Sequence, residues 1–321
     1  MADELQLNST SQSLLNQVAH YFQGDVQVQF IGTFKSGTVR HDQAQVIQNG
    51  QQLLVQVSDL TAPDFVVTHE LLHLLMTLRG FPKIYFPLTT DDHQLDNQLQ
   101  YFGTELFDII LHLVVYPEQR RHGLITPEIE AAYVRGVRQL ITPEIGKLDN
   151  EMIKRLVVII DALVLLGPTL GDYRSVFEQN FPMATAAAQH LYQKITAKPT
   201  DEPFQVRRNA VKLFKAFDDQ MRTWKLAELH LTDFAMITSV FSKRQLQLQV
   251  KQVFKLYHSE LKDKESGTRA VVGFALADDQ NSLVLAGPST PSAGRQFIQE
   301  NYEKTVSELF NELKLPYLLR S

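Results

Sequence analysis

Two histidines and a glutamate stand close together in an otherwise apolar segment, FVVTHELLHLLMTLRG (65–80). His69, Glu70 and His73 form an H-E-x-x-H pattern, and residues four apart on a helix lie roughly 40° apart around its axis. Both imidazoles therefore face one direction and could share a cation, with a third ligand from elsewhere and a fourth position left to water. Glu70 would be the general base, because it could take a proton as that water attacks a carbonyl.

A structural interpretation of the same pattern is a hydrogen-bonded pair of a histidine and a glutamate inside a core. Burying three polar groups without partners would cost several kcal/mol. A metal ion removes that cost, so the apolar setting of His69 and His73 favours a metal site. Zinc is the expected cofactor, although imidazole-rich sites also accept iron, cobalt or nickel.

The third ligand is expected from a second apolar run, YFGTELFDIILHLVVYPEQ (101–119). Glu105, Asp108 and His112 interrupt it at spacings of three and four, which places them on one stripe of a helix. We expect His112 to be the third ligand, with Glu105 as the alternative and Asp108 orienting an imidazole. The other interpretation of His112 is a core histidine bonded to a helix carbonyl.

Tyrosines could also take part in the chemistry. Tyr101, Tyr116 and Tyr133 could each supply a phenol that stabilises an oxyanion. Their spacing selects none of the three.

The pattern His69-Glu70-x-x-His73, on a helix that follows a sheet and precedes a second helix with acidic and histidine residues, resembles the zincin class of zinc metallopeptidases. The resemblance covers at most residues 53–123 and is specific over the five motif residues. It implies zinc at His69 and His73, Glu70 as catalytic base, and hydrolysis of a peptide bond.

The chain departs from the named branches of that class. The metzincin extension would need a glycine and a histidine where this chain has Met76 and Arg79, which excludes that branch. The thermolysin-like branch uses a downstream glutamate, which Glu105 could supply. The subfamily stays open.

These residues need a helix and a sheet to position them. Val26–Phe34 and Leu53–Leu60 are rich in β-formers, and we expect them to form a small antiparallel sheet packed on the H-E-x-x-H helix. Pro63 and Asp64 mark the start of that helix and Gly80 its end. A second long helix is predicted over Asp96–Arg121, interrupted or ended near Pro117.

The rest of the chain is predicted to be helical almost throughout to about residue 265, followed by a strand, a turn and a returning strand over Ala270–Gly287. The loop GPSTPSAG then leads into a last helix, Gln296–Leu313. The predicted fold class is α+β, mostly α. We expect a metal-binding region over residues 1–125 and a mainly helical second lobe over 126–321.

Composition limits the function further. The 321 residues contain no cysteine, so a metal must be held by histidines and carboxylates, and a reducing compartment fits. With 31 Lys+Arg against 36 Asp+Glu, the net charge of −5 gives no sign of a nucleic-acid partner. The most apolar run, Met152–Gly167, is too short and too charged to span a membrane. No secretory signal is recognised at the N-terminus, and we expect a cytoplasmic protein.

Two functions follow as hypotheses. The first is a zinc-dependent hydrolase, a peptidase acting on a peptide or protein substrate. The alternative is a non-catalytic binding or regulatory protein on a zincin-like scaffold, with a structural or vestigial metal site. Glu70 favours the first, because a purely structural site has no use for a general base. The sequence gives no indication of the oligomeric state.

Overall fold

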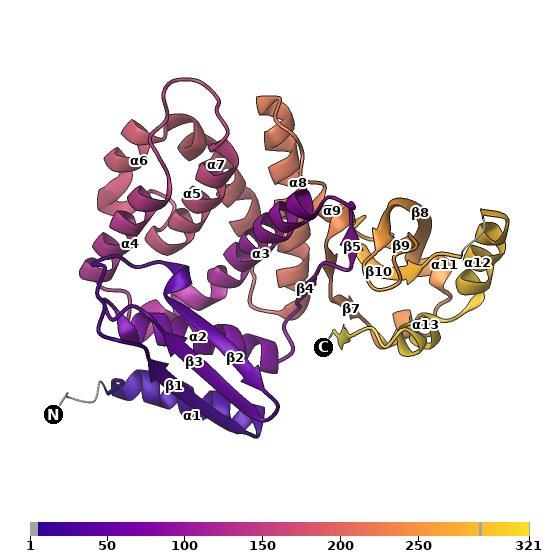
Figure 1. Cartoon of the computed structure of the whole chain (residues 1–321), viewed down its shortest axis with the longest axis horizontal. Coiled ribbons are helices and arrows are strands. Elements are labelled where there is room, and N and C mark those ends of the chain that lie inside the picture. The colour runs from indigo at the N-terminus through magenta and orange to yellow at the C-terminus, as the bar shows by residue number, and fades with distance from the viewer. Residues whose placement is uncertain (1–5, 289–290, 321) are drawn as a thin grey trace. The chain divides into compact units, whose positions relative to one another are not determined.

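The computed structural model describes residues 6–288 and 291–320 of the chain, which divides into two compact units (Figure 1). The first unit combines Met1–Gly80 with Leu111–Gln193, and the second combines Phe81–Ile110 with Lys194–Ser321. Each unit is thus built from two separate segments, whereas the sequence suggested consecutive regions meeting near residue 125. The long helix α3 (His93–Arg121) contributes its first part to the second unit and its last part to the first.

The sheet of the first unit has three strands in the order β1-β3-β2. Their bounds are β1 (Asp25–Phe30), β2 (Ala44–Asn49) and β3 (Gln52–Val57). Strands β2 and β3 pair antiparallel around a tight turn, where Gly50 adopts a φ of +58° that suits glycine. Strands β1 and β3, the two that the sequence indicated, pair parallel. The sheet is therefore mixed, not wholly antiparallel as expected.

The H-E-x-x-H segment forms helix α2 (Pro63–Leu78), as predicted. Pro63 occupies its first turn, where the missing N–H costs no hydrogen bond. The helix packs against β2, β3 and helix α1 (Ser9–Phe22), so it is buried on most of its circumference. The side-chain amide of Gln119 on α3 donates to the Phe65 carbonyl at 2.8 Å and to the Thr68 hydroxyl at 3.0 Å. These bonds tie α2 to the last turns of α3.

Helix α3 is continuous over 29 residues and includes Pro117, where the sequence suggested a break. The remaining elements of the first unit are helical: η1 (His41–Gln43), α4 (Pro127–Leu140), α5 (Met152–Leu166), η2 (Gly171–Tyr173), α6 (Arg174–Asn180) and α7 (Pro182–Thr196), whose last residues belong to the second unit. The apolar run that begins at Met152 is the buried helix α5. Among the described residues, no helix combines the length and the hydropathy needed to cross a membrane.

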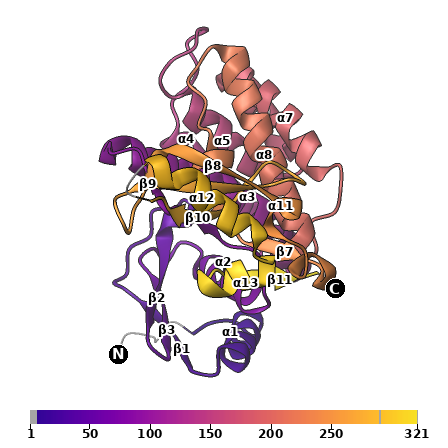
Figure 2. The ribbon, with the colours of Figure 1, turned by 90° about the vertical axis from the view of Figure 1, so that its right-hand side faces the viewer.

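The second unit mixes helices with an antiparallel sheet in the order β10-β9-β8-β5. Beside the sheet lie α12 and α13, which join it in one hydrophobic cluster (Figure 2). The bounds are β4 (Ile84–Tyr85), β5 (Leu88–Thr89), α8 (Pro203–Trp224), α9 (Leu231–Phe234), β6 (Met236–Ile237), β7 (Ser239–Phe241), α10 (Lys243–Leu246), α11 (Val250–Val253), β8 (Phe254–Asp263), β9 (Arg269–Ala275), β10 (Asn281–Ala286), α12 (Pro291–Glu303), α13 (Val306–Glu312) and β11 (Tyr317–Leu319).

The predicted fold class, α+β and mostly α, is confirmed, and so is the C-terminal hairpin, which is β9 and β10. Two further local predictions were wrong. Strand β8 lies in a stretch expected to be helical, and the last helix is divided into α12 and α13 by the capping box of Thr305 and Glu308. Part of the predicted GPSTPSAG loop, Ser289 and Thr290, lies outside the described residues.

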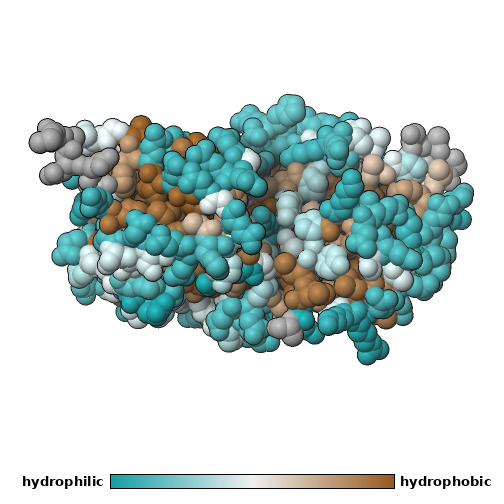
Figure 3. Space-filling model, turned by 90° about the horizontal axis from the view of Figure 1, so that it is seen from below, coloured by the Kyte–Doolittle hydropathy of each residue, from teal (hydrophilic) through white to brown (hydrophobic). Residues whose placement is uncertain are grey.

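The surface is mostly hydrophilic on the face shown in Figure 3, with hydrophobic side chains exposed among the polar ones. In the first unit, Tyr21, Ile31 and Phe34 are large hydrophobic residues that stay exposed. Single exposed apolar residues of this kind are normal and indicate no function by themselves.

Candidate metal centre

Four imidazole rings gather inside the first unit. His69 and His73 come from α2, His112 from α3 and His41 from the short helix η1. The ring centre of His69 lies 4.7 Å from that of His73, 4.8 Å from that of His112 and 5.0 Å from that of His41. His112 is likewise 4.9 Å from His41 and 5.2 Å from His73. The H-E-x-x-H spacing and the folding of the chain thus bring these rings together.

Three of these rings form a group that could hold a metal ion. The ligand nitrogens of His41, His69 and His112 all lie within 4.8 Å of one another. Tetrahedral zinc with imidazole ligands separates their nitrogens by about 3.4 Å, so modest side-chain rotations would close the site. His69 and His112 are each 4% exposed. The Nδ1 atom of His69 is buried and has no hydrogen-bond partner among the described residues, which is costly unless it ligates a metal.

One buried carboxylate contacts two of these imidazoles and holds them in place by hydrogen bonds. Asp161 on α5 is 6% exposed, and its Oδ1 lies 2.6 Å from Nδ1 of His112. Its Oδ2 lies 3.0 Å from Nε2 of His41 and accepts hydrogen bonds from the hydroxyls of Tyr133 at 2.6 Å and Tyr116 at 3.0 Å. A carboxylate bonded to one ring nitrogen leaves the other nitrogen available as a ligand and fixes the ring orientation.

Burial sets the protonation states in the cluster. It lowers the pKa of His69 and of His73 well below the usual histidine value, and the neighbouring imidazoles lower both further. Burial also lowers the pKa of His112, against the opposing effect of Asp161. For Asp161, burial would raise the pKa, but His112 and His41 hold it well below its usual value. Neutral imidazoles beside an ionised carboxylate are the forms in which histidines ligate a metal.

The loop that carries His41 is held against α4. The backbone N–H of Val39 donates to the Ala132 carbonyl at 3.1 Å, and the Arg135 guanidinium donates to the Gly37 carbonyl. Gly136 makes this approach possible, because a Cβ atom there would lie 2.5 Å from the Val39 carbonyl oxygen. The position of His41 therefore depends on a glycine in α4.

Glu70 and His41 lie where the cluster meets solvent. The side chain of His41 is 36% exposed, and Glu70 is half-buried. Burial raises the pKa of Glu70 to about 7, although the charge of His41 acts in the opposite direction. A carboxyl group with a pKa near neutrality is suited to accept and return a proton.

The other residues singled out from the sequence lie elsewhere or have different partners. Glu105 and Asp108 are on the part of α3 that belongs to the second unit, and neither is in a group of potential ligands formed by the described residues. Tyr116 and Tyr133 donate to Asp161, as described above. Tyr101 is 50% exposed in the second unit.

His41 and Asp161 are residues that sequence reasoning missed. Asp161 had a usable signal, since it is one acidic residue within an apolar helix, the same feature that drew attention to His112. His41 stands in a polar segment, Arg40-His41-Asp42, and no pattern in the sequence points to it.

No protein-family model, curated protein or solved structure matches this chain. The resemblance to zincins therefore depends on the motif and its surroundings in this chain alone.

Proposed function

We propose that this protein is a zinc-dependent hydrolase that cleaves peptide bonds. The observation that carries the proposal is the cluster of His41, His69 and His112 beside His73, in which His69 and His112 are buried, with Glu70 near His41 at its solvent side. The arrangement offers imidazole ligands to a metal and a carboxylate next to them, which are the parts that metal-assisted hydrolysis requires.

Zinc bound by imidazoles acts as a Lewis acid, acidifying water and polarising a carbonyl group. The protein's own groups supply the remaining functions. Glu70 takes the proton from the attacking water and returns it to the leaving amine, which general-base residues of this kind do. Asp161 holds His112 and His41 in fixed orientations and compensates the positive charge at the centre.

The ligand set is proposed to include His69 and His112, with His41 or His73 as the third imidazole. His41 is supported by the distances, since it belongs to the group of ligand atoms within 4.8 Å of one another. His73 is supported by the motif and by its ring, which lies 4.7 Å from that of His69. The carboxylate alternative, Glu105, has no support from the grouping of the described residues.

The first test is the zinc content of the protein purified without chelators or a histidine tag, measured by plasma mass spectrometry. We expect about one zinc per chain in the wild type and none in His69→Ala or His112→Ala. His190→Ala is the matched control, because His190 is an exposed histidine of α7 in the same unit. A wild type that contains no metal and takes up none from added zinc would overturn the proposal.

Two more variants decide the third ligand. If His41→Ala loses zinc and His73→Ala keeps it, the set is His41, His69 and His112. The reverse result assigns His73 as expected from the motif. A casein or peptide-library cleavage assay of the zinc-loaded protein then tests hydrolysis, and a zinc-loaded protein that cleaves no peptide bond contradicts the peptidase assignment.

A further inference from the structure

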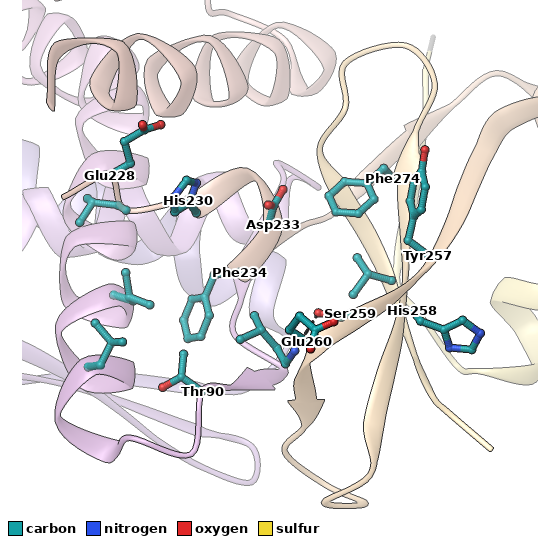
Figure 4. A pocket seen from close by; sticks show the side chains of 15 residues that line it. Thr90, Glu228, His230, Asp233, Phe234, Tyr257, His258, Ser259, Glu260 and Phe274 are labelled. Carbon is teal, nitrogen blue, oxygen red and sulfur yellow. Dashed lines mark hydrogen bonds between the residues drawn. The ribbon is translucent and has the colours of Figure 1, made fainter. Parts of the chain in front are cut away.

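The second unit contains a pocket of about 520 Å³ (Figure 4), a volume within the range of small-molecule sites. Its wall comes from Thr90 and the beginning of α3, from α9 and the connection that precedes it, and from strands β8 and β9. All of these segments belong to the same unit, so the pocket is formed within one compact body.

Apolar and aromatic side chains make up most of the pocket wall. They include Leu99, Phe234, Tyr257, Val272 and Phe274. Tyr257 remains 51% exposed at this site, although a tyrosine ring is an amphipathic surface that gains from contact with a ligand. The wall therefore suits a ligand with an apolar or aromatic body.

The charged groups of the wall are acidic. Glu228, Asp233 and Glu260 line the pocket together with two histidines, and no lysine or arginine is among the lining residues. A ligand with a negative group would meet repulsion above all from Asp233, because Glu228 and Glu260 are paired with arginines that lie outside the lining. A wholly apolar ligand would strip water from those carboxylates without replacing it, which is unfavourable.

The three carboxylates differ in their partners. Glu228 pairs with Arg222 at 2.7 Å, and Glu260 pairs with Arg269. Asp233 has no ion pair among the described residues, and its carboxylate receives a long contact of 3.4 Å from the Thr232 hydroxyl. Figure 4 shows Asp233 between His230 and Phe274 in that view. A cation in the pocket would give this carboxylate the partner that it lacks.

Partial burial raises the pKa of Asp233, while the charge of His230 acts in the opposite direction. The Asp233 residue is nevertheless exposed, so an incoming cation can reach its carboxylate from solution, and a nearby opposite charge favours the ionised carboxylate. The ammonium group of Lys264 already lies 5.8 Å from the centre of the Phe234 ring, so the ammonium group of a ligand is expected at Asp233 and its apolar body at the rings. Aromatic faces attract cations of this kind.

We propose that this pocket binds an organic cation: an amine whose ammonium group pairs with Asp233 and whose apolar or aromatic body packs against Phe234 and Phe274. Nothing in this inference depends on the metal centre or on hydrolysis. A second cluster, Asp218 with Glu228 and His230, adjoins the pocket, but two backbone N–H groups already occupy Asp218. The cluster therefore adds negative charge near the site and is not itself proposed as a metal site.

The test uses two probes that have the same aromatic body and opposite charges, tryptamine and indole-3-propionate, in titration calorimetry with the full chain. We expect tryptamine to bind at least 10-fold more tightly than the acid. Asp233→Asn should weaken tryptamine binding about 10-fold and leave the weak binding of the acid unchanged or improved, because one ion pair is lost.

Asp201→Asn is the matched control, since it removes the same charge from an exposed residue of the same unit that does not line the pocket. It should bind tryptamine as the wild type does. Circular dichroism confirms that both variants are folded. Equal affinity for the two probes, no binding of tryptamine at millimolar concentration, or an equal loss in both variants would each overturn the proposal.

Discussion

The candidate metal centre of the first unit and the pocket of the second both contain aspartate, histidine and tyrosine side chains, but their aspartates have different surroundings. Asp161 is buried and surrounded by two imidazoles and two hydroxyls, whereas Asp233 lies at a pocket wall without an ion-pair partner among the described residues. A carboxylate with a full set of protein partners holds other side chains in place. A carboxylate without them favours a ligand from solution. This difference between the two aspartates agrees with the two proposals, a metal ion in the first unit and an organic cation in the second.

The largest effect is expected from Glu70→Gln. Removal of a general base typically lowers the rate of hydrolysis about 10² to 10⁴-fold, while zinc content should not change because Glu70 is not a ligand. The measurement is peptide cleavage beside plasma mass spectrometry. Glu128→Gln, at the exposed start of α4, is the control and should keep full activity. Full activity in Glu70→Gln would contradict the catalytic role.

Asp161→Asn should weaken zinc binding roughly 10 to 100-fold, because residues that orient metal ligands have effects of this size. Competition with a zinc chelator measures the affinity. The same variant should bind tryptamine as the wild type does, and Asp233→Asn should hold zinc as the wild type does. A loss of both functions in either variant would remove the distinction between the two sites.

Tyr133→Phe tests how much the buried network stabilises the first unit. The change removes the 2.6 Å hydrogen bond to Asp161. Hydrogen bonds to charged groups contribute about 1.5 to 3 kcal/mol, and we expect the lower end because Asp161 keeps its other partners. Urea denaturation of the metal-free protein measures the loss. Tyr257→Phe, at a half-exposed ring in the second unit, should leave the free energy of unfolding nearly unchanged.

Gly136→Ala should have the smallest effect on the free energy of unfolding. Whether the variant is more or less stable than the wild type is the informative result. Alanine in a helix interior usually stabilises relative to glycine by about 0.5 to 1 kcal/mol. Here the new Cβ would press on the Val39 carbonyl, so we expect a loss of stability and weaker zinc binding through displacement of His41. A more stable variant with unchanged zinc affinity would show that the loop does not need this close approach.

The parts of the site that follow from local spacing could be predicted from the sequence. His69 and His73 share a helix face because they are four residues apart, and His112 stood out because its neighbours are apolar. Asp161 is 49 residues from His112 and 120 from His41, so only the folded chain shows that they meet. Spacing on α3 also suggested Glu105, which lies in the other unit.

Contacts between segments distant in sequence also explain why parts of the predicted fold were wrong. Strand β2, AQVIQN, is too polar to stand out, and without it the parallel pairing of β1 with β3 could not be inferred. Strand β8, FKLYHSELKD, carries charged residues at spacings that also suit a helix, and its pairing with β9 decides its conformation. Strand identity here depends on partners distant in sequence.

The convergence on Asp161 has a consequence for when the protein could acquire a metal ion. Residues of η1, α3, α4 and α5 all meet at this carboxylate, and contacts between segments so distant in sequence form late. During synthesis, a chain that has emerged only as far as His112 already displays the H-E-x-x-H helix but lacks the group that orients His112 and His41. The metal ion would then bind only after α5 has packed against the cluster. Its binding would stabilise a fold whose other contacts have already formed.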